Sequence, residues 1–329
     1  MDRKRRSLVA AIGAGAIAAS LPAHGQQPAK SPVRIGVLTA GSPESARLPL
    51  EPFWRRMREL GYVEGKSVAY EMRFAHGQFD RLPALAKELV ALPVDVIYAT
   101  SAQPAIAARS ATSSIPIVFS GVSDPVTIGL AESLARPGGN ATGVSLLALD
   151  TAPKHVELLR IAVPKLSRVA VLLNPAERTS ATPMALFAET ARAVGIQVLA
   201  VEASTPAEID AAFARMAGEQ AEAVYLSTIL SFLERHRIAE LSIKHRIPAS
   251  ASFREFVEAG GLMSYGSNLA ERLEQLATYV DRILRGARPA EMPIEQPTRL
   301  HLAINLKTAR TLGIVIPPSL RLRADEVIE

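Results

Sequence analysis

Residues 115–145 read IPIVFSGVSDPVTIGLAESLARPGGNATGVS and decide the fold of the whole chain. The first five residues, 115–119, are apolar and partly β-branched, which predicts a short buried strand. A polar loop follows, in which Asp124 before Pro125 predicts the N-cap of a short helix. The PGGN sequence at 137–140 ends that helix, and residues 141–147 are again extended. Because open α/β sheets bind ligands at the carboxyl ends of their strands, this stretch predicts half a binding cleft and a crossing into a second lobe.

Outward from this stretch, short apolar runs alternate with helical patterns on both sides. A length of 329 residues is typical of about two domains. Repeated strand–helix units predict an α/β protein with two Rossmann-like lobes, parallel sheets and right-handed crossovers. The other predicted strands are 33–38, 68–74, 94–99, 168–173, 195–201, 223–226 and 247–250. The predicted helices include 50–60, 154–162, 232–245 and 269–284.

The N-terminal residues 1–25 have the pattern of an export signal. Arg3, Lys4, Arg5 and Arg6 precede an apolar run at 8–21, and small residues near Gly25 offer a cleavage site. The run is shorter than the roughly 20 residues that a membrane-spanning helix needs. Arg5-Arg6 also permits the twin-arginine route. We therefore expect a cleaved signal peptide and a mature protein in the periplasm.

Charge and composition exclude several classes of function. The full chain has 37 basic and 32 acidic residues, of which the signal holds four and one, so 33 and 31 remain. This near balance, with the charges interspersed, argues against nucleic-acid binding. The absence of cysteine excludes disulfides, thiolate catalysis and a lipid-anchored cysteine. No phosphate loop, nucleophile elbow or metal-ligand spacing occurs, so we expect no enzyme, cofactor or metal.

Three predicted strand ends carry a polar residue followed by proline: Gln103-Pro104, Asp124-Pro125 and Asn174-Pro175. Such junctions expose backbone N–H groups that suit carboxylates, although each could simply cap a helix. The specific hypothesis is a cleft with Ser101 and Asp124 on one wall and Asn174 and Thr228 on the other. Asp124 would then bind the amino group of a zwitterion. The complete set of candidate ligand-binding residues is Ser42, Ser101, Gln103, Ser120, Asp124, Asn174, Thr228, Phe253 and Tyr265.

Residues 33–329 resemble the exported ABC-transporter substrate-binding proteins, a family that includes tryptophan-binding members. The stretches that carry the resemblance are RELGYVEGKSV (58–68), RFAHGQFDRLPALAKELV (73–90), VDVIYATSAQPAIAA (94–108), the opening stretch 115–145, REFVEAGGLMSYG (254–266) and INLKTARTLGIVIPPSLRLRADEVIE (304–329). The resemblance implies a type I periplasmic-binding fold whose lobes are joined by three crossings, near 141–147, 262–266 and 300–305. Lobe 1 would comprise 33–145 plus 262–298, and lobe 2 would comprise 146–261 plus 299–329.

The function that this resemblance implies is the solute-binding component of an ABC import system. The ligand would be a small polar or zwitterionic molecule, such as an amino acid or an aromatic amino-acid-like compound, bound by hinge closure. The partner would be an ABC permease in the inner membrane, and the protein would be a monomer. A sensor that delivers its ligand to a membrane-bound signalling receptor is the alternative. A DNA-binding regulator would begin with a helix-turn-helix, where this chain has the pattern of an export signal. An exported enzyme would need a set of catalytic residues, and the sequence shows no such motif.

Overall fold

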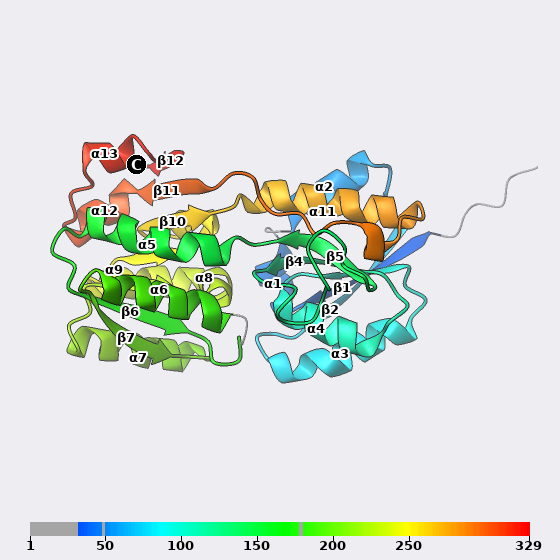
Figure 1. The fold of residues 1–329 in the computed structure, drawn as a ribbon, viewed down its shortest axis with the longest axis horizontal. Coiled ribbons are helices and arrows are strands. Elements are labelled where there is room, and N and C mark those ends of the chain that lie inside the picture. The colour runs from blue at the N-terminus through cyan, green and yellow to red at the C-terminus, as the bar shows by residue number, and fades with distance from the viewer. Residues whose placement is uncertain (1–31, 48–49, 178–179) are drawn as a thin grey trace, which may run out of the picture. The chain divides into compact units, whose positions relative to one another are not determined.

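The computed structural model describes residues 32–47, 50–177 and 180–329. They form two α/β lobes, each with one β-sheet that has helices on both faces (Figure 1). The predicted signal peptide, residues 1–25, lies outside the described residues. None of the helices within these three ranges is both long and apolar enough to cross a membrane. The prediction of two α/β lobes with mainly parallel sheets is confirmed.

The first sheet is entirely parallel, with the strand order β2-β1-β3-β4-β5. Side chains alternate along each strand, so Val96 and Tyr98 pack against one helical layer while Ile97 and Ala99 pack against the other. Both faces of β3 are therefore buried, which explains why this central strand carries no charged residue, whereas the edge strand β2 includes Glu71 and Arg73. The strands are β1 (Val33–Thr39), β2 (Val68–Phe74), β3 (Val96–Ala99), β4 (Ile117–Val122) and β5 (Ala141–Ser145). The helices of this part are α1 (Pro43–Arg47), α2 (Glu51–Glu59), α3 (Leu82–Ala91), α4 (Ala102–Ala111) and α11 (Leu269–Leu284).

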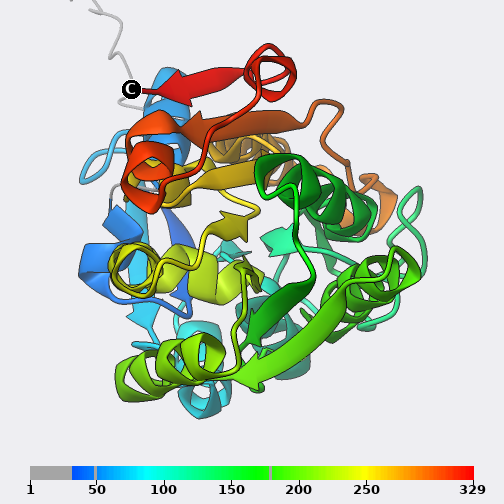
Figure 2. The same ribbon diagram turned by 90° about the vertical axis from the view of Figure 1, so that its left-hand side faces the viewer.

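The second sheet has the order β12-β11-β10-β9-β8-β6-β7, and its one antiparallel pair is β10 with β11 (Figure 2). Its strands are β6 (Arg168–Leu173), β7 (Gln197–Glu202), β8 (Ala223–Leu226), β9 (Ala249–Ala251), β10 (Met263–Gly266), β11 (His301–Asn305) and β12 (Glu326–Ile328). Its helices are α5 (Ala148–Ala162), α6 (Ala181–Ala193), α7 (Pro206–Gly218), α8 (Thr228–Leu233), α9 (Arg235–His245), α10 (Arg254–Glu258), α12 (Leu306–Leu312) and α13 (Pro318–Arg321).

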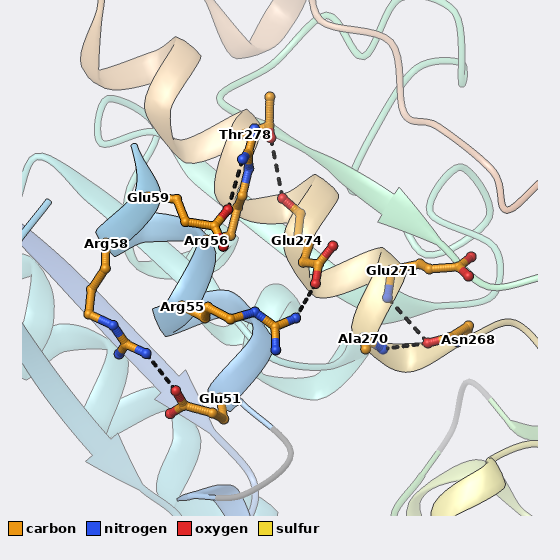
Figure 3. Close-up of polar contacts among 10 residues, drawn as sticks. All are labelled: Glu51, Arg55, Arg56, Arg58, Glu59, Asn268, Ala270, Glu271, Glu274 and Thr278. Carbon is orange, nitrogen blue, oxygen red and sulfur yellow. Dashed lines mark hydrogen bonds and ion pairs between the residues drawn. The ribbon is translucent and has the colours of Figure 1, made fainter. Parts of the chain in front are cut away.

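Helix α11 covers the first sheet although it lies more than a hundred residues further along the chain. Its buried side chains join the core of α2, β3 and β4, and α2 and α11 lie side by side (Figure 3). Arg55 of α2 pairs with Glu274 of α11 across this contact. Asn268 caps α11, since its Oδ1 accepts the backbone N–H groups of Ala270 at 2.9 Å and Glu271 at 3.2 Å. The cap and the contact with α2 together orient the first turns of α11.

The helix predicted after Asp124 is wrong. Residues 125–129 form turns, and Asp124 Oδ1 accepts the backbone N–H of Thr127 at 3.0 Å. The chain reverses at Gly129, whose φ of 74° is left-handed, so a single turn is not continued as a helix. Strand β4 also runs on through Ser120 to Val122 instead of ending at Phe119.

The helix predicted at 232–245 is in fact two helices, α8 and α9, which meet at Glu234. The boundary at residue 262 also needs correction, because β10 pairs with β9 and β11 in the second sheet. The chain therefore returns to the first sheet at residues 267–268, just before α11. Strands β11 and β12 of the C-terminal tail pair in the second sheet.

Candidate functional site

A cavity of about 80 Å³ opens where the strands of the first sheet end. The strand order of this sheet changes direction between β1 and β3, and ligands of doubly wound sheets bind at such a switch point. The loops after β1 and β3 and the end of β4 form this side of the cavity. The residues they contribute are Thr39, Ala40, Gly41, Thr100, Ser101, Ser120 and Gly121.

The second sheet and α11 complete the same cavity. Strand β8 ends at Leu226 and Ser227 is extended, so α8 begins with Thr228 at the cavity. Phe253, which precedes α10, packs its ring at 5.4 Å from the ring of Phe232. The lining residues from these elements are Thr228, Ile229, Phe232, Leu233, Phe253, Leu269, Arg272 and Leu273. The first group of lining residues is thus rich in hydroxyl groups, and the second group consists mainly of apolar and aromatic side chains.

Two serines from the first sheet's side line the cavity. Ser101 Oγ is buried and has no hydrogen-bond partner among the described residues. Ser120 Oγ lies 3.2 Å from the hydroxyl of Tyr98 and 3.3 Å from the carbonyl oxygen of Thr100. Burial raises the pKa of the Tyr98 hydroxyl, which therefore stays protonated at neutral pH. The hydroxyl of Ser120 is thus already engaged, whereas that of Ser101 can donate to a polar group of a ligand.

Arg272 is the single charged side chain among the described residues that line the cavity. It is 3% exposed, its Nη1 donates to Ser267 Oγ at 2.6 Å, and its Cζ lies 5.6 Å from the ring centre of Phe253. Its Nε has no acceptor among the described residues, and no described carboxylate lies within ion-pair distance. Burial lowers its pKa to about 10, so the guanidinium remains charged at neutral pH. A buried, unpaired guanidinium suits a carboxylate, which it can bind with two parallel hydrogen bonds.

Sequence reasoning missed Arg272, although a signal was present. The predicted helix 269–284 has an apolar face that includes Leu269, Leu273 and Leu276. Arg272 lies three residues after Leu269 and four before Leu276, so it belongs to that same face. A lone arginine within an apolar stripe needs a partner, and here that stripe continues into the cavity.

Four candidates from the sequence lie together in the cavity: Ser101, Ser120, Thr228 and Phe253. Gln103 and Asn174 are outside the described lining of the cavity. Gln103 connects the first lobe to the loop after β6, and Asn174 holds that loop from within. Gln103 Nε2 donates to the carbonyl oxygen of Ala176 at 3.0 Å, and Asn174 Oδ1 accepts the N–H of Ala176 at 2.9 Å. The loop after β6 is therefore held by Asn174 and contacted by Gln103 of the first sheet.

Ser42, Asp124 and Tyr265 are not among the described lining residues. Ser42 exchanges hydrogen bonds with Ser45 at the start of α1. Tyr265 lies in β10 with its ring 6.1 Å from that of His155 in the second core. Asp124 accepts hydrogen bonds from Thr127, which lower the pKa of its carboxyl. Ligand contact by these three residues stays a prediction.

Glu177 is a second group that the sequence did not single out. It is buried in the loop after β6, and its Oε2 accepts the backbone N–H of Ile229 at 3.2 Å. Burial raises the pKa of this carboxyl to about 7, although the hydrogen bond from the Ile229 N–H opposes the shift. Glu177 thus supports the first turn of α8, which carries several lining residues.

Residues 35–328 match the family of ABC transporter substrate binding proteins over almost the whole described chain. The chain belongs to this family. The resemblance expected from the sequence is thereby confirmed, and the two α/β lobes are those of type I periplasmic-binding proteins. ABC substrate-binding proteins bind small molecules, work with a membrane permease and are typically extracytoplasmic.

Three relatives in or near this family are informative. A tyrosine-binding protein of Clostridioides difficile (strain R20291) is 27% identical over 266 residues, which cover 80% of this chain and 75% of the relative. The crystal structure of an ABC domain from Streptococcus pneumonia in complex with L-Trp is 27% identical, covers 91% of this chain and 100% of that chain, and has a TM-score of 0.81. A conserved domain protein from Vibrio cholerae O1 biovar El Tor is also 27% identical, with 90% and 99% covered and a TM-score of 0.83.

Proposed function

We propose that this substrate-binding protein is the exported solute-binding component of an ABC import system. Its ligand is a small aromatic molecule of the amino-acid class that carries a carboxylate. The observation that carries this proposal is the buried guanidinium of Arg272 in a cavity with the aromatic walls Phe232 and Phe253. The named ligands of two relatives, tyrosine and L-Trp, support the same class of molecule.

In this proposal the carboxylate of the ligand binds Arg272, where Nε still lacks an acceptor among the described residues. The hydroxyl of Ser101, which has no hydrogen-bond partner among the described residues, donates to the ligand from the first sheet. The aromatic ring packs between the phenyl rings and the leucines of α8 and α11, which line the cavity. Few directional polar groups and a large apolar wall are typical of small-molecule sites.

Ligand binding would favour a closed arrangement of the two lobes. The cavity takes its lining from both sheets, so a ligand contacts both only when they approach each other. The hydrogen bond from Gln103 of α4 to Ala176 in the loop after β6 joins the two lobes and would favour the closed arrangement. The inner-membrane permease would recognise the closed form. We further propose that the protein is a monomer in the periplasm and that its signal is cleaved near Gly25.

A thermal-shift titration with L-phenylalanine, L-tyrosine and L-tryptophan tests the proposal. We expect at least one of them to raise the melting temperature of the purified protein. Arg272→Met should remove the ligand-induced shift, and it should still fold, because an apolar side chain replaces an unpaired buried charge. Arg282→Met is the matched control, since Arg282 is exposed on the same helix and stacks on Tyr279 outside the cavity.

Loss of the ligand-induced shift in Arg272→Met alone would support the assignment. The same shift in both variants would exclude Arg272 as the carboxylate partner, and no shift with any aromatic carboxylate would overturn the proposed ligand class. Asp124→Ala, measured in parallel, decides whether the turn after β4 contributes to binding. Loss of the shift in that variant would make Asp124 a ligand contact.

A further inference from the structure

The described lining of the cavity includes a positive charge, that of Arg272, but no negative charge, and this difference affects which charged groups a ligand can carry. The proposed function places a carboxylate against Arg272. An α-amino acid also brings an ammonium group, which is positively charged at neutral pH and needs acceptors of its own. Burying an ammonium group without an anionic or strongly accepting partner costs several kcal/mol. The acceptors available in the cavity therefore decide whether an amino acid or its des-amino analogue binds better.

No carboxylate belongs to the described lining of the cavity. Glu177 directs its carboxylate to the N–H of Ile229, and Asp124 directs its own to the N–H of Thr127. Glu255 acts electrostatically on Arg272, but it lines a different, polar pocket beside Arg254, and burial raises the pKa of its carboxyl. None of the three belongs to the described lining of the cavity.

The backbone acceptors of the lining are also engaged. The carbonyl oxygens of residues 39–41 accept the N–H groups of residues 75–77 at distances of 2.7–3.0 Å. The carbonyl of Thr100 accepts the hydroxyl of Ser120, and that of Thr228 accepts the hydroxyl of Ser231 at 2.8 Å. At these carbonyl oxygens an ammonium group would compete with hydrogen bonds that already hold the loops, which leaves it neutral hydroxyls such as that of Ser101.

We infer that the cavity selects an aromatic monocarboxylate without an α-ammonium group, such as an arylpropionate, over the corresponding amino acid. This inference rests on the proposed function and narrows its ligand class. The guanidinium of Arg272 and the free hydroxyl of Ser101 supply donors for an anion. The walls supply apolar area for a ring, and no described lining side chain supplies a negative charge.

The test compares ligands that differ only in the charged groups. Dissociation constants are measured by calorimetry for 3-phenylpropionate and L-phenylalanine, for indole-3-propionate and L-tryptophan, and for phenethylamine. We expect each propionate to bind about tenfold more tightly than its amino acid, or better, because the unpaired ammonium must be desolvated. Phenethylamine, which lacks the carboxylate, should not bind.

A designed acceptor should reverse this preference. Thr228 is a half-buried lining residue at the first position of α8, where an acidic side chain is favourable. Thr228→Asp should therefore improve the affinity for the amino acid relative to the propionate by about tenfold or more, by supplying the missing charge. Thr228→Asn, which has the same shape without the charge, is the matched control and should retain the wild-type preference.

The outcomes separate this inference from the proposed function. If an amino acid binds as tightly as its propionate, or more tightly, the inference is overturned while the proposed function stands. If neither the amino acids nor the propionates bind, both the inference and the proposed function are overturned. If the propionates bind more tightly than the amino acids but phenethylamine binds as tightly as 3-phenylpropionate, Arg272 does not select a carboxylate and the inference is again overturned. These comparisons use the wild-type protein, so they remain decisive even if Thr228→Asp fails to fold.

Discussion

Replacing Glu177 with glutamine should change how the stability of the protein depends on pH. Glu177 is 8% exposed, so its charged form is poorly solvated even though it accepts one hydrogen bond from Ile229. Burial raises its pKa from 4.5 to about 7 in the folded protein. The protonated acid is therefore favoured by folding. Glutamine has nearly the same shape and can still accept from Ile229, but it does not titrate.

The magnitude follows from the difference between the two pKa values. A folded-state pKa above the unfolded value means that the stabilisation is complete below pH 4.5 and is lost as pH rises through about 7. At about 1.4 kcal/mol per pKa unit, the wild type loses about 3 kcal/mol over this window. For a chain of this length that corresponds to roughly 6 °C in melting temperature. The glutamine variant should not lose it, so its stability relative to the wild type should rise with pH.

The assay is thermal and urea unfolding of both proteins without ligand at pH 4.5 and pH 8, and the control variant Glu222→Gln is compared with the wild type at pH 3 as well. Glu222→Gln is a control at a carboxyl whose pKa is shifted in the opposite direction. Burial raises the pKa of Glu222, but hydrogen bonds from Ser167 and Arg168 outweigh it, so the net shift is downward. Its contribution is present above pH 4.5 and is lost as pH falls. A stability difference between Glu177→Gln and the wild type that is the same at both pH values would refute the reasoning about Glu177.

Three further comparisons probe the fold. Gly121→Ala and Gly129→Ala both force a side chain into left-handed backbone, at about 1–2 kcal/mol each, but only at Gly121 would the β-carbon lie 3.2 Å from a backbone carbonyl oxygen. Gly121→Ala should therefore lower the melting temperature more, and equal losses would contradict this. Phe187 is fully buried and stacked on Tyr225 at 4.3 Å, so Phe187→Ala should cost about 3–5 kcal/mol in urea unfolding; a cost below about 1 kcal/mol would show that the core collapses into the space. Thr205→Ala should cost about 1 kcal/mol by removing the capping box of α7, whereas Thr205→Ser should retain it; equal losses would exclude the cap as the cause.

The predicted strands agree with the structure where an apolar run is bounded by polar or glycine-containing segments. The strands predicted at 168–173 and 223–226 have the observed bounds of β6 and β8. The reason is local, because a strand buried on both faces needs an unbroken apolar run and its flanking loops need polar residues. The helix expected after Asp124 failed for an equally local reason, namely the left-handed turn at Gly129.

The candidate site could be predicted only in part. Ser101, Ser120 and Thr228 were found because polar residues that follow buried strands collect at one edge of a sheet. Arg272 was not found, because its significance depends on where α11 packs. That helix follows the second sheet along the chain and yet covers the first, beside α2. No periodicity within residues 269–284 shows which sheet the apolar face will contact.

The sequence by itself determined the alternation of strands and helices, the polar strand ends and the family, since each of these is written in local patterns of a few to about thirty residues. Tertiary structure alone decided which strand ends share a cavity and which side chains face it. It placed Ser101 and Thr228 together, left Asp124 on a turn and brought Arg272 to the aromatic wall. The physical reason is that a binding site is a contact between distant segments, and the free energy of burying apolar faces selects those contacts.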